Sequence, residues 1–444
     1  MIEIQKRENS NFKNFEDKII NCKNSKELDD LYSNFIDEYL RLNHQYSFTE
    51  SFDKNFVLNQ INCLDGQIDL PLYCIPIGVK DIFNTKKLPT SMGSDIWKGF
   101  KSGNNARVID DIIDSGGIIF SKTTTAEFAV HFITPQSTIN PYNSNHITGT
   151  SSSGSAVSVA CGALPISIGT QTAGSIIRPA SFCGVYGFKP SFGAIDRTGV
   201  LKTNDTFDTI GFLSADIYGL KKIFFSTLKK GFDYPYSVNY FQNYNNYLKK
   251  KKSEIKIGVF NDELFVLRNF TDYVKVDFLE TIKQMSKCFK IIGIQNIDFL
   301  NEIHLLHEMM YSKSLSYYFK NEMKNHEFVS EVMKDMINRG DKISTDSYMN
   351  CMKQQPIFRK RFDKIFEDFD FIVVPSTASY APEISKNEID DTCLIWTFLG
   401  YPTITLPLYI CKEKNLPYGL QIIAKKFDDF SLLEFSERLQ KLFY

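Results

Sequence analysis

Residues 149–180 read GTSSSGSAVSVACGALPISIGTQTAGSIIRPA, and residues 75–81 upstream read IPIGVKD. The first run of small residues leads into a helix near Ser155, and the apolar runs in both segments predict buried strands. Backbone N–H groups at a helix start, and in a turn of small residues around Ser175, can bind an anion or an oxyanion. The two segments therefore predict strands alternating with helices, and a serine surrounded by backbone donors.

The same alternation continues through the chain. Helical spacing covers 11–64, 107–114, 273–288, 300–337 and 430–442, and apolar strand runs cover 70–82, 118–120, 164–168, 255–260, 371–375, 403–408 and 418–423. This pattern predicts an α/β fold with a large, mixed and twisted sheet covered by helices on both faces. Because no internal repeat or long linker divides the chain, we expect one domain over 1–444. Within it we expect an N-terminal helical arm over 1–65, a core over 66–215 and a helical insertion over 265–365.

Composition excludes several classes of partner. The formal net charge of -1 and the pI near 6.6 give no global attraction to nucleic acid or to anionic membranes. The nine cysteines are scattered and form no Cys-x-x-Cys pair, which is typical of reduced thiols. No apolar signal core and no run of about 18 apolar residues is present. We therefore expect a cytoplasmic protein with no membrane partner.

A serine nucleophile needs a base, and the sequence offers Lys80 for that role. Six histidines are present and none lies in a Gly-x-Ser-x-Gly elbow, which argues against a Ser-His-Asp triad. Lysine can act as the base if burial leaves it neutral, and Lys80 ends an apolar strand. The local sequence alone favours another role, an ion pair between Lys80 and Asp81 or another carboxylate at a strand end. The serine-rich run, taken alone, is typical of a flexible connector. The combination of these segments points to amide-bond chemistry.

These segments resemble the signature blocks of the amidase signature family, which contains amidases and amidotransferase A subunits. Residues 75–81 resemble its lysine block, 149–155 its Gly-Gly-Ser-Ser-Gly-Gly-Ser block, and 170–179 its nucleophile block. The spacing between Ser151 and Ser175 agrees as well. Further matches lie at 181–190 and 416–423, so the resemblance extends over about 25–440.

The resemblance implies a catalytic triad. Ser175 matches the family's nucleophile, and Ser151 matches a serine on a cis peptide bond that relays a proton between Lys80 and Ser175. The backbone N–H groups that match the oxyanion hole are those of Thr172, Ala173, Gly174 and Ser175. Candidate substrate contacts are Phe128, Ser152 and Arg178. No cofactor is implied.

Three departures from the family pattern and one pair of histidines remain. Thr150 and Ser153 stand where the family has glycine, so a loop that needs positive φ at either position would be strained, and Ala173 replaces a glycine that is frequent before Gly174. His304 and His307 lie three residues apart, but no third metal ligand is identifiable. We therefore expect one side of a helix there and no metal site.

The function that the resemblance implies is hydrolysis of a small or medium carboxamide to a carboxylate and ammonia or an amine, through an acyl-enzyme on Ser175. The expected partner is a small-molecule amide, without nucleic acid, and the expected assembly is a homodimer. One alternative is the A subunit of a glutamine-dependent tRNA amidotransferase, although residues 175–179 lack the Ser-Ile-Arg-Gln-Pro order common there. Another is a catalytically silent amidase-like binding scaffold, against which the retained Lys80 and Ser151 argue.

Overall fold

The computed structural model describes residues 11–130, 137–229, 254–260, 269–295, 297 and 299–443. Within these ranges the strands form one mixed sheet of eleven strands, in the order β1-β3-β2-β4-β6-β5-β10-β11-β9-β7-β8. The strands are β1 (Thr49–Phe52), β2 (Pro76–Lys80), β3 (Ile118–Thr123), β4 (Ile166–Gln171), β5 (Tyr186–Lys189), β6 (Thr209–Ser214), β7 (Lys256–Phe260), β8 (Lys290–Ile294), β9 (Phe371–Pro375), β10 (Thr403–Cys411) and β11 (Leu416–Ala424).

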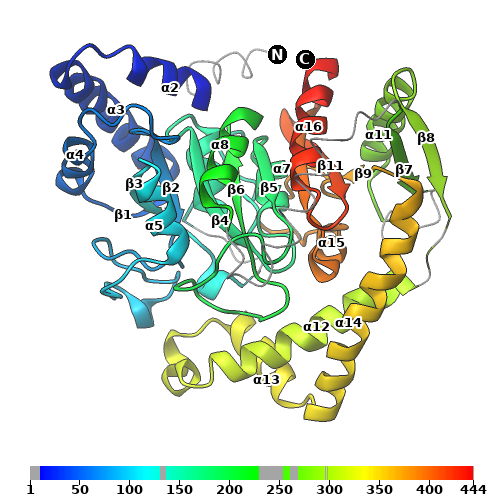
Figure 1. Ribbon diagram of the computed structural model, residues 1–444. Helices are drawn as coiled ribbons and strands as arrows, with labels where there is room; N and C mark the ends of the chain where they lie inside the picture. Colours follow the sequence, from blue (N-terminus) through cyan, green and yellow to red (C-terminus); the bar gives the residue numbers. More distant parts are fainter. Residues whose placement is uncertain are drawn as a thin grey trace.

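Helices surround this sheet. In Figure 1, α2 to α4 lie beside the β1 end of the sheet, and α12 to α14 lie together, with α12 and α14 in contact with α15. None of the helices in the described ranges combines the length and the apolar character that crossing a membrane needs. The helices are α2 (Phe12–Ile20), α3 (Ser25–Tyr46), α4 (Lys54–Cys63), α5 (Arg107–Asp114), α6 (Ser153–Ala160), α7 (Ile177–Phe182), α8 (Ile217–Thr227), α11 (Asp272–Met285), α12 (Phe299–Tyr318), α13 (Glu331–Asp341), α14 (Thr345–Ile365), α15 (Cys393–Leu399) and α16 (Asp429–Phe443).

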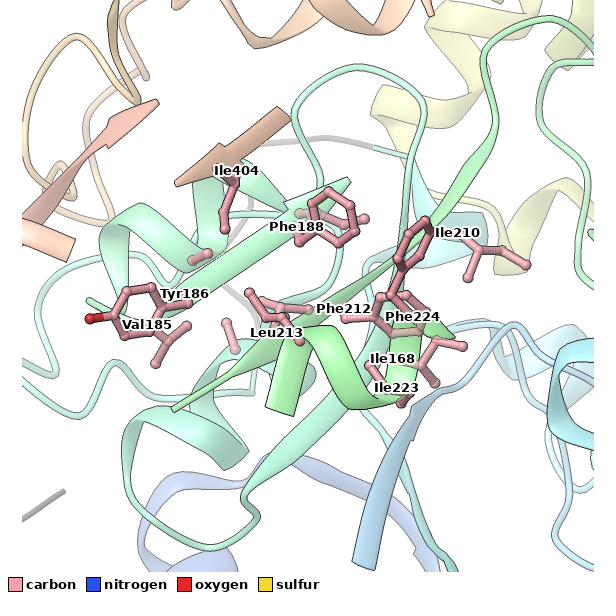
Figure 2. Packing of buried hydrophobic residues seen from close by; sticks show 14 of the residues in the cluster. Ile168, Val185, Tyr186, Phe188, Ile210, Phe212, Leu213, Ile223, Phe224 and Ile404 are labelled. Carbon is pink, nitrogen blue, oxygen red and sulfur yellow. The ribbon is translucent and has the colours of Figure 1, made fainter. Parts of the chain in front are cut away.

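Both faces of the central sheet are covered. Every residue of β2, β3 and β4 is buried, which is the pattern of strands enclosed on both sides. Phe212 and Leu213 are successive residues of β6, so their side chains point to opposite faces, and both are fully buried. On one face the ring of Phe188 lies 5.2 Å from that of Phe224 in α8 (Figure 2). The prediction of an α/β sheet covered on both faces is confirmed.

The parallel part of the sheet positions the reactive residues. β2 pairs in parallel with β4, with Val79 opposite Ile168, and in parallel with β3 on its other side. Parallel strands bring their carboxyl ends to the same edge of a sheet, where sites commonly form. Lys80 ends β2 and Gln171 ends β4. The lysine and the loop that carries Ser175 therefore lie at one edge.

Four strands, β1, β5, β6 and β8, lie outside the strand runs expected from the sequence, and two of them lie in regions expected to be helical. The region 265–365, expected to be a helical insertion, contains β8, which pairs in parallel with β7. The expected arm over 1–65 contains β1, which pairs antiparallel with β3. Segments of four or five residues carry too little periodicity to be separated from adjoining helices. Residues 1–10 and 265–268 lie outside the described residues, and the division of 1–444 into these regions stays a prediction.

Candidate active site

Lys80 lies at the carboxyl end of β2 and is completely buried. Its Nζ is 2.8 Å from Ser151 Oγ and 3.0 Å from Thr170 Oγ1. Burial lowers the pKa of Lys80 well below its ordinary value of 10.5, and the carboxylate of Asp208 opposes this only in part. The site therefore favours a neutral amine held against the hydroxyl of Ser151, which is the state that a lysine base requires.

Asp81 does not pair with Lys80. Its carboxylate lies 2.9 Å from Lys122 Nζ, and both side chains are fully buried. It also accepts hydrogen bonds from the backbone N–H groups of Ser91, at 2.8 Å, and Met92, at 3.1 Å. No carboxylate in the described part of the chain forms an ion pair with Lys80. The expectation of a Lys80–Asp81 ion pair is therefore wrong, because Asp81 faces a lysine contributed by the neighbouring strand β3.

The buried ion pair gives a stability prediction. Lys122→Met should lower the free energy of unfolding by about 3–5 kcal/mol, because it leaves Asp81 as a buried and unpaired charge. Urea unfolding at pH 7 measures this change. The double variant Asp81→Asn with Lys122→Met should recover part of the loss, since it removes the buried charge. A Lys122→Met protein as stable as the wild type would contradict the ion pair.

The serine-rich run forms the turn before α6. The peptide bond between Thr150 and Ser151 is cis, and Ser151 is fully buried. Gly149 has φ of 77°, and a Cβ there would lie 2.8 Å from Pro179 Cα, so this position needs glycine. Thr150 and Ser153 do not have positive φ, and Ser153 is the first residue of α6. The backbone strain that a positive φ would cause at Thr150 and Ser153 is therefore absent.

Ser175 lies in the loop between β4 and α7 and is 3% exposed. The loop is fixed at its end by Gln171, whose Oε1 accepts hydrogen bonds from the N–H groups of Ile176, at 2.8 Å, and Ile177, at 3.0 Å. This side chain therefore satisfies donors of the first turn of α7 that have no partner within the helix. The nucleophile loop is held in place by the last residue of β4.

The peptide groups before Ser175 form a set of donors. Among the described residues, none accepts a hydrogen bond from the backbone N–H of Ala173, Gly174 or Ser175. Gly174 packs closely, since a Cβ there would lie 2.9 Å from the guanidinium of Arg178 and 3.2 Å from Cys393 Cβ. Small side chains and successive N–H groups beside a serine suit the binding of an oxyanion. The backbone N–H of Thr172 likewise has no acceptor among the described residues, while its hydroxyl donates to Asp208 Oδ1 at 2.7 Å.

The side chains of the three candidate substrate contacts all contact other residues of this chain. Ser152 is fully buried, and its Oγ donates to the carbonyl of Thr170 at 3.2 Å. Phe128 is fully buried, with its ring 4.6 Å from that of Phe319. Their roles in binding substrate stay predictions.

Arg178 is also engaged within the chain. Its Nε lies 2.8 Å from Asp391 and 3.2 Å from Glu388, while its Nη1 has no hydrogen-bond partner among the described residues. The carboxylate of Asp391 offsets the charge of the guanidinium beside the nucleophile loop, while burial raises the pKa of Glu388 to about 7. A role for Arg178 in substrate binding likewise stays a prediction.

Sequence reasoning missed the contribution of His307. Its Nε2 lies 2.8 Å from the carbonyl oxygen of Thr172, and its ring stacks on Phe207 with centroids 4.5 Å apart. Burial lowers the pKa of His307 to about 4, so the ring is neutral near pH 7. The only sequence signal was its spacing from His304 on one helix. Among the described residues, no group of three or more His, Cys, Asp or Glu side chains is arranged to hold a metal.

This arrangement allows hydrolysis by a serine nucleophile with a lysine, in place of a histidine, as the base. Comparison with known proteins agrees. Residues 30–433 match the family described as Amidase. Because this match spans most of the chain, the chain belongs to the amidase family and is an enzyme that acts on carbon–nitrogen bonds.

Relatives and solved structures fit this family. The glutamyl-tRNA(Gln) amidotransferase A subunit of Borreliella burgdorferi is 30% identical over 420 residues, covering 84% of each chain. The corresponding A subunit from Natranaerobius thermophilus is 26% identical over 411 residues, covering 84% of this chain and 82% of the relative. The peptide amidase of Stenotrophomonas maltophilia has a TM-score of 0.78 at 19% identity, covering 92% of this chain and 93% of its own. Allophanate hydrolase of Kluyveromyces lactis has a TM-score of 0.83 at 19% identity, covering 98% of this chain and 73% of its own. The structural likenesses show a shared fold.

Proposed function

We propose that this protein hydrolyses a small or medium carboxamide to a carboxylate and ammonia or an amine, through an acyl-enzyme on Ser175. The observation that carries the proposal is the buried Lys80, whose Nζ lies 2.8 Å from Ser151 Oγ and whose pKa is lowered by burial. A lysine kept neutral in this way is suited to act as a base. The backbone donors next to Ser175 supply the second requirement, stabilisation of the oxyanion.

The reaction begins with proton transfer. The Ser175 hydroxyl attacks the amide carbonyl carbon while its proton passes to Ser151 Oγ, and the Ser151 proton passes to Lys80 Nζ. The carbonyl oxygen becomes an oxyanion that the N–H groups of Ala173, Gly174 and Ser175 bind. The proton then returns through Ser151 to the amide nitrogen, the carbon–nitrogen bond breaks, and ammonia or an amine leaves. Water attacks the remaining ester by the same route, which releases the carboxylate and restores the Ser175 hydroxyl.

Asp208 tunes the lysine base. It accepts hydrogen bonds from the N–H groups of Thr203, at 2.8 Å, and Asn204, at 3.0 Å, which hold its carboxylate in place. Its charge raises the pKa of Lys80 against the larger, opposite effect of burial. Burial thus favours the neutral amine, and the carboxylate of Asp208 favours the positive charge that the amine gains during the reaction.

The relatives support a second candidate function. Those named above are A subunits of an amidotransferase that acts on glutamyl-tRNA(Gln), at up to 30% identity. In this candidate the same serine chemistry would release ammonia from glutamine within a complex of several subunits. The order of residues 175–179 argues against this candidate, and a protein that is active as a monomer or homodimer without partner subunits would argue against it as well.

The location of the protein follows from its cysteines. The free thiols of all nine cysteines support the proposal of a reducing, cytoplasmic location.

A substrate panel tests the two candidates. Purified protein is incubated with aliphatic, aromatic and amino-acid amides and with glutamine, and released ammonia is measured alongside the mass of the protein by light scattering. We expect release from one class of simple amide by a homodimer of this chain alone. Release from glutamine only would favour the amidotransferase function. If the folded protein neither releases ammonia nor reacts with a fluorophosphonate at Ser175, the silent scaffold is favoured instead.

A further inference from the structure

Three consecutive carbonyl groups of the nucleophile loop, the loop between β4 and α7 that carries Ser175, accept hydrogen bonds from other residues of the chain. The carbonyl of Thr172 accepts from His307 Nε2 at 2.8 Å, and that of Ala173 accepts from Thr397 Oγ1 at 2.8 Å. The carbonyl of Gly174 accepts from a backbone N–H of α7, at 2.9 Å. Because a trans peptide directs its C=O and its N–H to opposite sides, each bond also sets the direction of the next residue's N–H. The three hydrogen bonds therefore orient the N–H groups of Ala173, Gly174 and Ser175 away from the residues that bind the carbonyl groups.

His307 is suited to hold one peptide rigidly. A carbonyl oxygen can only accept, so Nε2 must carry the hydrogen in this contact. The ring is 2% exposed and lies nearly parallel to that of Phe207, with an angle of 15° between them. A stacked and buried ring has one orientation, and its N–H therefore fixes the peptide between Thr172 and Ala173 in one plane.

Thr397 holds the next peptide through a short chain of hydrogen bonds. Gln171 Nε2 donates to Thr397 Oγ1 at 2.9 Å, and this donor directs the single hydroxyl proton of Thr397 toward an acceptor. The available acceptors are the carbonyl of Ala173, at 2.8 Å, and that of Cys393 within α15, at 3.1 Å. The same Gln171 side chain holds the first turn of α7, so the strand end, the loop and α15 form one network.

We propose that His307 and Thr397 are positioning residues of the oxyanion site. Both come from the second half of the chain, His307 from α12 and Thr397 from α15, and outside the segments that resemble family signatures. Neither acts on the substrate; each fixes a peptide plane whose N–H binds the developing oxyanion. The inference rests on the proposed function, because it requires acyl transfer to Ser175.

A purely structural role makes a different prediction. Buried carbonyl groups need hydrogen-bond partners in any case, and losing a partner lowers stability. If His307 and Thr397 served only that need, their removal would lower the unfolding midpoint and leave turnover per folded molecule unchanged. A positioning role instead lowers kcat with KM unchanged, because a misdirected N–H weakens binding of the transition state and not of the ground state.

The test compares matched pairs of variants. Thr397→Val removes the hydroxyl at nearly constant shape, and Thr397→Ser keeps it; His307→Leu removes the donor, and His307→Gln can restore one. Two rates are measured at pH 7, labelling of Ser175 by a fluorophosphonate and hydrolysis of the best amide, together with thermal unfolding. We expect Thr397→Val and His307→Leu to lower the labelling rate and kcat about 10–100-fold, as displaced catalytic groups do. Thr397→Ser should stay within about 3-fold of wild type, and His307→Gln should recover part of the loss.

The two proposals fail in distinguishable ways. Wild-type protein that folds but is neither labelled at Ser175 nor active would overturn the proposed function. Wild type that is labelled, with Thr397→Val and His307→Leu labelled at the same rate, would overturn the positioning role alone. If Thr397→Val does not fold, the His307 pair decides by the same rates. Equal losses in Thr397→Val and Thr397→Ser would also overturn the role of the hydroxyl.

Discussion

Replacing Ser175 with alanine should lower kcat for amide hydrolysis roughly 10⁴–10⁶-fold, as loss of a serine nucleophile does in other hydrolases. No acyl-enzyme can form without the hydroxyl, and the remaining N–H donors then act only on attack by water. The fold should be unaffected, because no side-chain hydrogen bond of Ser175 to another described residue is present. Thermal unfolding of Ser175→Ala should therefore match the wild type.

The control variant comes from the same serine-rich region. Ser155 is also fully buried, but its hydroxyl lies 2.8 Å from Thr123 Oγ1 and 3.1 Å from the carbonyl of Ile168, away from the lysine. Ser155→Ala should lower the free energy of unfolding by ~1 kcal/mol and keep turnover per folded molecule. Ammonia release and fluorophosphonate labelling of both variants give the comparison. Turnover by Ser175→Ala at the wild-type rate would rule out Ser175 as the nucleophile.

The placement of the candidate site residues was predictable where a local sequence pattern coincided with a family resemblance. The strand end at Lys80 and the turn before Ser155 follow from short apolar and small-residue runs. The 2.8 Å contact between Lys80 Nζ and Ser151 Oγ depends on the parallel pairing of β2 with β4. The alternation of strands and helices along the sequence implies this parallel pairing. The expected ion pair between Lys80 and Asp81 was wrong, because the sequence shows that these two residues are adjacent but does not show that Asp81 faces Lys122 on β3.

The groups that hold the nucleophile loop could not be found from sequence. His307 lies 135 positions from Thr172, and Thr397 lies 224 positions from Ala173. A single histidine or threonine on a helix has the same pattern whether it faces solvent, core or a loop. Only the packing of α12 and α15 against the loop gives these residues their partners. The strands β1, β5, β6 and β8 were missed for a related reason, since cross-strand pairing and not local periodicity defines them.

Replacing Lys80 with methionine should lower kcat about 10³–10⁴-fold or more, the contribution expected of a base that acts on a serine. The residual rate should not recover at high pH, because the group that titrates is gone. Wild-type kcat should instead rise with pH as Lys80 loses its proton, at a pH below the ordinary lysine pKa of 10.5. A pH–rate profile of both proteins measures this, with Lys87→Met as control because Lys87 is an exposed lysine.

Lys80→Met should also change the free energy of unfolding, in a direction that the lowered pKa of Lys80 determines. The folded-state pKa of Lys80 is lowered, so between that value and 10.5 the unfolded chain binds a proton that the folded chain lacks. The free energy of unfolding of the wild type therefore rises with pH across this window, relative to Lys80→Met. At neutral pH the buried amine opposes folding, and the methionine variant should be the more stable one, as in other trade-offs between activity and stability. Urea unfolding of both proteins at pH 7 and pH 10 measures the difference, which should shrink at the higher pH. A difference that is constant across this range would show that Lys80 keeps an ordinary pKa, and it would remove the basis for Lys80 as the base.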